Sequence, residues 1–173
     1  MTGWIVFLVI VLIAALAAGA EVYRELHHFR ITRYSVRSEK LAGLARDVKI
    51  LFLSDLHDRT YGKNNVTLLE SIRSQSPDLI LIGGDMLVGK ENAFCDNALA
   101  LIRELPKICP VICANGNHEQ RLKDDPETYG DVYEKYKKAL EGCGVHFLEN
   151  ESIRVELGTS DLAIYGLELP SAS

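Results

Sequence analysis

The pattern of the chain begins with an unbroken apolar run. Trp4 to Ala20 reads WIVFLVIVLIAALAAGA and contains no charged side chain. A helix needs about 17 to 25 apolar residues to cross a bilayer, so the run is just long enough for one transmembrane helix. Ala18-Gly19-Ala20 also fits the cleavage site of a signal peptide, but Met1-Thr2-Gly3 lacks the basic residue that such a peptide carries. A buried core helix is disfavoured because the run has no polar face, so we expect a membrane anchor.

Shorter patterns in the rest of the chain predict strands. Phe29–Ser38 alternates apolar and polar residues, as a half-exposed strand does. Val48–Leu53, Leu79–Ile82 and Val111–Ala114 are short apolar runs that end in polar residues, a pattern typical of strands buried on both faces. We therefore expect three buried strands and one half-exposed strand before residue 115.

Helices are expected between these strands, and further strands after them. Helical spacing and stop signals predict helices over Asn65–Gln75, Asn92–Leu105 and Pro126–Glu141. Three more strands are expected over Val145–Leu148, Ile153–Leu157 and Leu162–Tyr165. Alternation of strands and helices builds a parallel sheet, and the last strands arrive without intervening helices, so the predicted class is mixed α/β.

Composition and charge exclude some classes of protein. The chain has 173 residues, of which 47% are hydrophobic and 25% charged, as in an ordinary folded domain rather than a disordered one. A net charge of −5 argues against nucleic-acid binding, which needs a basic face. The charge is uneven, because Glu21–Asp47 carries six basic and four acidic residues whereas Val48–Ser173 carries 13 basic and 20 acidic ones. We expect an apolar head, a mildly basic neck and an acidic body.

Each predicted buried strand is followed by polar residues that core packing does not require. The three clusters are Ser54-Asp55-Leu56-His57-Asp58, Gly83-Gly84-Asp85 and Asn115-Gly116-Asn117-His118-Glu119. In open α/β sheets, ligands bind beyond the carboxyl ends of the strands. Adjacent strands lie about 4.8 Å apart, so the three clusters can converge on one small site.

The residue types in these clusters indicate a metal site. Asp55 and His57 are two residues apart, so both point to one side if strand geometry persists. Asp85 follows two glycines, which let the backbone pass close to an ion, and Asn117 and His118 add an amide oxygen and an imidazole. Carboxylate, amide and imidazole without thiolate favour Mn, Fe or Zn. One carboxylate could bridge two ions about 3.5–4 Å apart. Singly each motif can be a plain turn or helix cap, but their succession indicates a site.

Taken together, the three polar clusters resemble the motifs of a known family. Asp55-x-His57, Gly84-Asp85 and Gly116-Asn117-His118-Glu119 are similar to the signature of calcineurin-like metallophosphoesterases. The stretches ILFLSDLHD, PDLILIGGD and VICANGNHE resemble the bacterial membrane-anchored branch, as does RITRYSVRSEKL after an apolar N-terminus. The resemblance implies the N-terminal half of a metallophosphoesterase β-sandwich flanked by helices and preceded by one transmembrane helix. Residues 1–27 would be the anchor and neck, and residues 28–173 the phosphoesterase domain.

The resemblance also implies roles for individual residues. Asp55 and His57 would hold the first metal ion, Asp85 would bridge two ions, and Asn117 would hold the second. His118 would contact the phosphate and protonate the leaving oxygen, which suits a group that titrates near neutrality. The implied nucleophile is a metal-bound hydroxide at a dinuclear site. The implied reaction is hydrolysis of a phosphomonoester, phosphodiester or pyrophosphate bond.

The sequence departs from the family downstream of these motifs. Members supply further metal-binding histidines, including a Gly-His-x-His turn, and run on well beyond the position of Ser173, so we expect a chain truncated at its C-terminus. His146 lies in a predicted strand, where a structural role is favoured over a ligand's. The alternative function is therefore a truncated, catalytically incompetent membrane protein that retains partial metal binding.

Partners and location follow from the same features. We expect a phosphorylated substrate, with lipid-linked phosphates as one candidate class, and no nucleic acid. The N-terminal helix would make the protein a single-pass protein of the cell membrane. Basic residues after the span favour a cytoplasmic body, but they are interleaved with Glu21 and Glu25, so the membrane face stays open.

Overall fold

The computed structural model describes residues 2–41, 46–91, 95–157 and 160–168. The chain divides into two compact units, Met1–Val36 and Arg37–Ser173, and each is described by itself. The second unit holds the sheet, and we call it the body.

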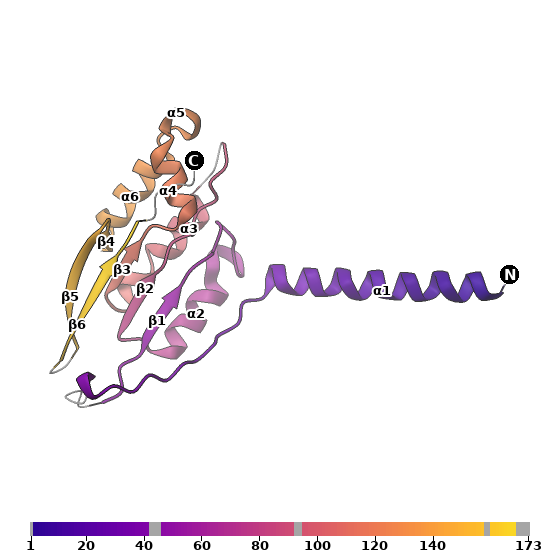
Figure 1. Cartoon of the computed structure of the whole chain (residues 1–173), viewed down its shortest axis with the longest axis horizontal. Coiled ribbons are helices and arrows are strands. Elements are labelled where there is room, and N and C mark those ends of the chain that lie inside the picture. The colour runs from indigo at the N-terminus through magenta and orange to yellow at the C-terminus, as the bar shows by residue number, and fades with distance from the viewer. Residues whose placement is uncertain (1, 42–45, 92–94, 158–159, 169–173) are drawn as a thin grey trace. The chain divides into compact units, whose positions relative to one another are not determined.

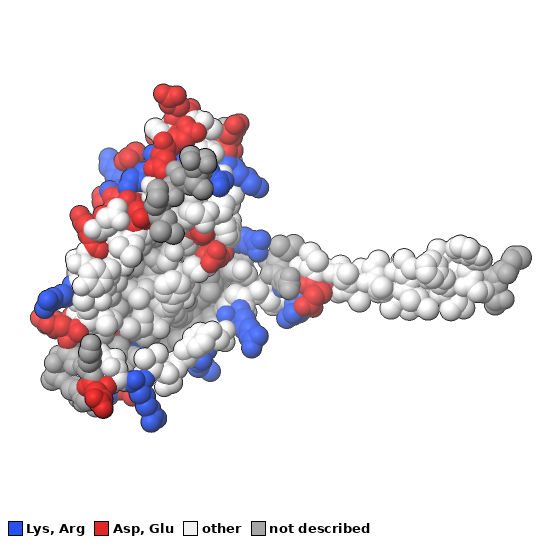
Figure 2. Space-filling model, viewed as in Figure 1, with Lys and Arg blue, Asp and Glu red and all other residues white. Residues whose placement is uncertain are grey.

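The first unit is dominated by α1, Thr2–His27 (Figure 1). Its stretch from Gly3 to Arg24 has a mean hydropathy of 2.8 and is long and apolar enough to cross a membrane. The apolar side chains along this stretch are exposed, with Trp4 at 74%, and Figure 2 shows a rod nearly free of charge until its C-terminal end. A core helix of a soluble domain would bury such side chains, so that interpretation does not fit α1.

The prediction of a strand over Phe29–Ser38 is wrong. Residues 28–38 form neither helix nor strand, and no described strand pairs with them. Alternating side chains satisfy the spacing of a strand, but its backbone N–H and C=O groups also need a neighbouring strand. Tyr34 and Val36 are accordingly exposed, at 88% and 80%.

The body is built on a parallel four-stranded sheet in the order β1-β2-β3-β4. The strands are β1, Ile50–Leu53; β2, Leu79–Ile82; β3, Val111–Ala114; and β4, His146–Leu148. The main crossover helices are α2, Val66–Gln75; α3, Asp96–Ile102; and α6, Val132–Gly142. Short 3-10 helices lie at Glu39–Leu41, Lys63–Asn65 and Leu105–Lys107. This arrangement confirms the predicted α/β class (Figure 1).

The sheet has two differently covered faces. Ile80, Val111 and Cys113 point to the face covered by helices, where Leu101 and Tyr136 are also fully buried. The opposite face carries a core of Leu79, Ile112 and Leu148, against which Leu81, Ile153, Val155 and Ile164 pack. Three of these come from an antiparallel hairpin of β5, Glu151–Leu157, and β6, Ser160–Gly166. The hairpin is thus a second β layer.

The exposure of side chains on strand β1 contradicts one prediction about burial. The apolar run Val48–Leu53 predicts a strand buried on both faces, yet Phe52 is 64% and Ile50 43% exposed. Strand β1 is the edge strand farther from the hairpin's core, which is centred on β2, β3 and β4. An apolar run is compatible with double burial, but it does not say how far the covering layer reaches.

Two predicted helices differ in length from those observed. The helix expected over Pro126–Glu141 is divided into α5, Pro126–Tyr129, and α6, because Gly130 between them has a φ of +69°. The helix expected over Asn92–Leu105 is observed as the shorter α3, and residues 92–94 lie outside the described ranges. An additional helix, α4, spans Asn117–Asp124, where we expected only a polar turn.

Candidate metal centre at the carboxyl edge of the sheet

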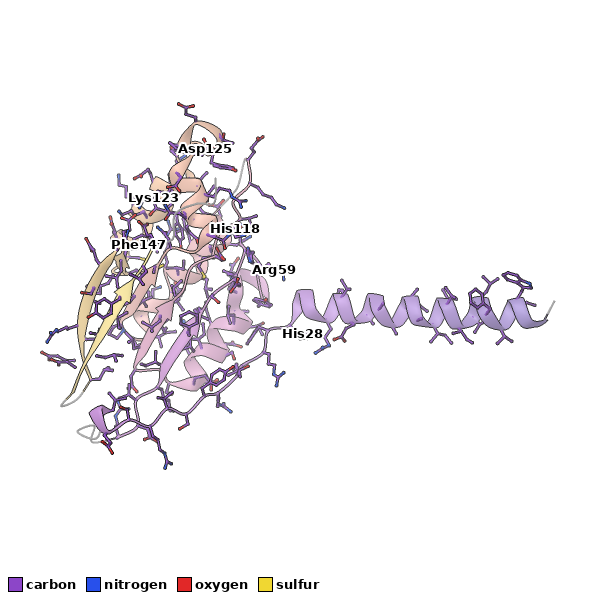
Figure 3. All side chains as sticks on the ribbon, in the orientation of Figure 1. His28, Arg59, His118, Lys123, Asp125 and Phe147 are labelled. Atoms are coloured by element: carbon purple, nitrogen blue, oxygen red, sulfur yellow. The ribbon has the colours of Figure 1, made fainter. Side chains whose placement is uncertain are left out.

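The three polar clusters do meet at the carboxyl end of the sheet. Strands β1 and β2 pair up to Leu53 and Ile82, and their hydrogen bonding continues beyond the strands. The amide of Asp55 donates to Gly84 O at 3.2 Å, and the amide of His57 donates to Asp85 O at 3.0 Å. Figure 3 shows His118 and Arg59, a neighbour of the first cluster, at one end of the sheet. The predicted convergence is confirmed for these loops.

The loop after β1, residues 54–58, has unusual backbone angles; Ser54 and Asp55 are exposed, His57 and Asp58 are half-buried, and Leu56 is buried. Asp55 and His57 have φ values of +57° and +50°, so the chain has left strand geometry, contrary to the premise of our prediction. Even so, His57 Nε2 lies 3.7 Å from Asp55 Oδ1, close enough for one ion between them. Left-handed non-glycine residues cost roughly 1–3 kcal/mol each and cluster at functional sites. We call residues 54–58 the exposed loop.

The loops after β2 and β3 are interlocked by two glycines. Gly84 has a φ of +87°, and a Cβ at this position would lie 1.9 Å from the amide nitrogen of Gly116. A Cβ on Gly116 would in turn lie 2.4 Å from both N and Oδ1 of Asp85. The glycines therefore let two backbones approach each other, whereas the sequence had indicated room for an ion. We call residues 83–89 and 115–119 the clamped loops.

Hydrogen bonds reinforce this contact around Asp85. Its Oδ1 accepts from the backbone amide of His118 at 2.9 Å. The carboxylate of Glu119, only 1% exposed, accepts from the amides of Asp85 at 2.7 Å, Leu87 at 2.8 Å and Gly116 at 3.0 Å. Sequence reasoning assigned Glu119 no role. Part of a signal was present, because Glu119 is the third residue of a helix that begins at Asn117, where a Glu can accept from the N-cap amide; the N-cap Gly116 has no side chain to complete a capping box.

His118 is held from behind by the backbone. Its Nδ1 accepts a hydrogen bond from the amide of Gly89 at 2.8 Å. A backbone N–H can only donate, so the neutral ring carries its proton on Nε2. The ring packs edge-on against His57, with centroids 4.8 Å apart. The predicted catalytic residue therefore lies beside a predicted metal ligand, with a hydrogen-bond donor at Nε2.

The remaining predicted residues are placed less tightly. Asn117 is the exposed first residue of α4, between Gly116 and His118, whose amides are both anchored. His146 starts β4 and pairs with Ile112, away from the carboxyl edge, which is consistent with a structural residue. Nothing in the geometry joins it to the site.

A polar cluster anchors the residue that precedes Gly116. Asn115 Nδ2 donates to the Tyr133 hydroxyl at 2.9 Å and to Glu168 Oε1 at 2.7 Å. Lys123 Nζ bridges Glu149 and Glu168 at 2.7 Å each. Burial alone would raise the pKa of Glu149, but hydrogen bonds from Lys123, Lys137 and Tyr133 outweigh it and lower the pKa to about 2. We call these residues the Glu149 cluster; it connects α4, α6 and the hairpin to the end of β3.

Asp58 belongs to the exposed loop but serves a helix. Its Oδ1 accepts from the amide of Ala98 at 2.9 Å, which satisfies a free donor at the start of α3. Asn97 Nδ2 donates to the Asp58 carbonyl at 3.0 Å. Burial raises the pKa of Asp58 against these hydrogen bonds. Asp58 therefore stabilises the connection from the exposed loop to α3.

The donors present suit a divalent cation, but they do not form a preassembled cluster. Among the residues described, no group of three or more His, Cys, Asp or Glu side chains has a geometry that could hold a metal ion. Asp55 and His57 make one oxygen–nitrogen pair, while Asp85 and Asn117 add oxygen donors from adjoining loops. Oxygen and imidazole donors fit Mn, Fe or Zn in kind. The assignment of these residues as metal ligands stays a prediction.

Comparison with known proteins agrees with the fold and the motifs. The family described as calcineurin-like phosphoesterase matches residues 48–167. Over 126 residues the chain is 28% identical to the uncharacterized metallophosphoesterase YkoQ of Bacillus subtilis (strain 168), covering 71% of this chain and 44% of YkoQ. It is 26% identical to the uncharacterized protein YpbG of the same organism, covering 90% of this chain and 55% of YpbG.

One solved structure also matches part of the chain. The crystal structure of phosphopantetheinyl hydrolase (PptH) from Mycobacterium tuberculosis matches with a TM-score of 0.48 and 23% identity, over 70% of this chain and 42% of that one. The chain spans about half the length of the curated relatives that it matches. Since the family match covers most of the body, the chain belongs to the calcineurin-like phosphoesterase family.

Proposed function

We propose that this protein hydrolyses a phosphomonoester, phosphodiester or pyrophosphate bond with two divalent cations at the carboxyl edge of its sheet. The observation that carries the proposal is the convergence of the Asp55–His57 pair with the Asp85–His118 contact at that edge. Membership of the calcineurin-like phosphoesterase family supports the same class of chemistry.

The oxygen and nitrogen atoms of these side chains suggest which residue would bind which cation. Asp55 and His57 would hold one cation, Asn117 the second, and Asp85 both. When bound, the cations would activate water and neutralise charge on the phosphoryl oxygens. Mn, Fe and Zn each suit this mixture of oxygen and imidazole donors.

His118 would act on the substrate rather than on metal. Its Nδ1 is engaged by the Gly89 amide, so its Nε2–H is the group available to the phosphate. That proton could be donated first as a hydrogen bond to a phosphoryl oxygen and then to the leaving oxygen, as in general-acid catalysis. Gly89 thereby fixes which nitrogen faces the reaction.

The test uses the full chain in detergent with bis(p-nitrophenyl) phosphate and added Mn²⁺. We expect hydrolysis that is lost with a chelator and abolished by Asp85→Asn, because the amide is a weaker and neutral ligand. Hydrolysis that persists in both conditions would overturn the proposal.

A second candidate function is partial metal binding without catalysis. It is favoured by the finding that three or more suitable side chains do not gather anywhere in the described ranges. The two functions differ in metal content. Two ions per chain at saturation, measured by elemental analysis after dialysis, support the enzyme; one ion supports the second candidate, and no bound ion contradicts both.

We also propose that α1 anchors the protein in a membrane. The support is its apolar stretch Gly3–Arg24. Resistance of the protein to carbonate extraction, with the N-terminal sequence intact, is the expected result. A mature chain that starts after Ala20 would instead show a cleaved signal peptide. An anchored site makes lipid-linked phosphates one candidate class of substrate.

A further inference from the structure

Glu119 does more than cap its own helix. A capping-box glutamate at this position reaches back to the N-cap amide, here that of Gly116 at 3.0 Å. Glu119 also accepts from the amides of Asp85 and Leu87, which lie 34 and 32 residues earlier in the chain. One carboxylate therefore ties the start of α4 to the loop that follows β2.

Among the described residues, no basic side chain pairs with this carboxylate. Glu119 is 1% exposed, and within the described ranges it forms no ion pair with Lys, Arg or His. Three amide dipoles and the N-terminal end of α4 offset it only in part. A buried anion of this kind favours a cation nearby, and its Oε2 lies 2.7 Å from the backbone nitrogen of Asp85.

We propose that Glu119 is a positioning residue for the divalent cations: its buried carboxylate sets the backbone of Asp85 and Gly116 and supplies behind them a negative charge that backbone amides offset only in part. The inference rests on the proposed function, because it assumes that Asp85 and Asn117 bind cations. It adds a residue that itself touches neither metal nor substrate. Partners behind a ligand commonly change metal affinity about 10–100-fold.

The two parts of this role can be separated by substitution. Glu119→Gln keeps the size and two acceptor contacts of the side chain but loses the charge and the contact to Leu87. Glu119→Asp keeps the charge but is too short to span the two loops. Glu134→Gln is the matched control, because Glu134 is the third residue of α6 as Glu119 is of α4, yet its side chain is exposed.

The experiment measures Mn²⁺ affinity calorimetrically, and amide hydrogen exchange in the metal-free full chain, in detergent. We expect the Mn²⁺ Kd to rise about tenfold or more in both Glu119 variants and to stay unchanged in the control. Exchange at Leu87 should become about tenfold faster in Glu119→Gln, because an amide bonded to a charged acceptor loses its partner. Far-UV circular dichroism confirms that each variant is folded.

Results that differ from these expectations would contradict either the proposed function or the role of Glu119. If the wild-type chain binds no Mn²⁺, the proposed function fails and this inference fails with it. If the wild type binds but the Glu119 variants bind equally well, only this inference fails. Weak binding in Glu119→Gln alone assigns the effect to charge and overturns the backbone-setting role, as does unchanged exchange at Leu87.

Discussion

The two halves of the candidate site are held in different ways. The clamped loops are fixed by Gly84, Gly116 and the buried Glu119 carboxylate before any ligand is present. The exposed loop follows an edge strand, and its Asp55 side chain is 66% exposed. Its left-handed backbone is held by amide contacts to the β2 loop. The difference teaches that the clamped half is fixed by buried contacts, whereas the side chains of the exposed half are expected to gain order when a ligand binds.

The largest effect is expected from breaking the clamped half. Gly84→Ala places a Cβ against the backbone of Gly116 at a φ of +87°, so the two loops must separate. We expect a loss of about 3 kcal/mol in the free energy of unfolding, from combined strain and overpacking, together with loss of Mn²⁺ binding. Gly144→Ala is the control, because Gly144 has the same φ but open space around it. Equal losses in chemical denaturation would show that the loops are not interlocked.

The next effect concerns chemistry at the boundary between the halves. His118→Ala removes the Nε2–H donor and should lower kcat roughly 10²–10⁴-fold, the usual contribution of general acid–base catalysis. Mn²⁺ affinity should change little, because His118 is not assigned as a ligand. His146→Ala, at the amino end of β4, should leave kcat unaltered. Steady-state kinetics and calorimetry on the full chain decide between catalysis and metal binding as the role of His118.

A substitution in the exposed loop should lower Mn²⁺ affinity without lowering the metal-free stability, unlike Gly84→Ala, which should lower both. Asp55→Gly removes a proposed ligand but places glycine where φ is +57°, which glycine adopts without strain. We expect the metal-free free energy of unfolding to stay within about 1 kcal/mol of wild type, because relief of strain offsets the entropy of glycine. Mn²⁺ affinity should fall at least as far as in the Glu119 variants. A marked loss of metal-free stability would mean that the exposed loop is as preorganised as the clamped ones.

The smallest expected effect is pH dependence from the Glu149 cluster. The folded pKa of Glu149, about 2, lies below its ordinary value of 4.5. Its contribution to stability is therefore complete above about pH 4.5 and is lost as the pH falls toward 2. After allowance for solvent screening, we expect about 1 kcal/mol between pH 5 and pH 3. Urea unfolding should show a flatter pH dependence in Glu149→Gln, and an identical slope would remove Glu149 as a source.

The sequence was most informative where a short apolar run is bounded by polar residues. Leu79–Ile82 and Val111–Ala114 were predicted to the residue, because central parallel strands admit little else. The prediction of a strand over Phe29–Ser38 was wrong because strand pairing depends on a partner strand, which an alternating pattern cannot reveal. Helix α4 was missed because Leu122 is the single apolar residue in Asn117–Asp124, which leaves no periodic stripe.

The site was predicted in position but not in geometry. Asp55 and His57 do lie together, yet through left-handed angles rather than the strand alternation that we assumed. Asp tolerates such angles, so the sequence permits them without requiring them. Glu119 and the Gly89 amide were not foreseen, because both act across the gap between two loops and one acts through its backbone. Contacts of this kind follow from the fold, not from local spacing.

The hydrogen bond from Gly89 to His118 also limits the kind of intermediate that can form. A nucleophilic imidazole attacks through an unprotonated nitrogen, but the lone pair of Nδ1 is occupied and Nε2 bears the proton. Transfer of a phosphoryl group onto His118 would have to break that contact first. For the proposed hydrolysis we therefore expect a single displacement by water, which would leave the configuration at phosphorus inverted rather than retained.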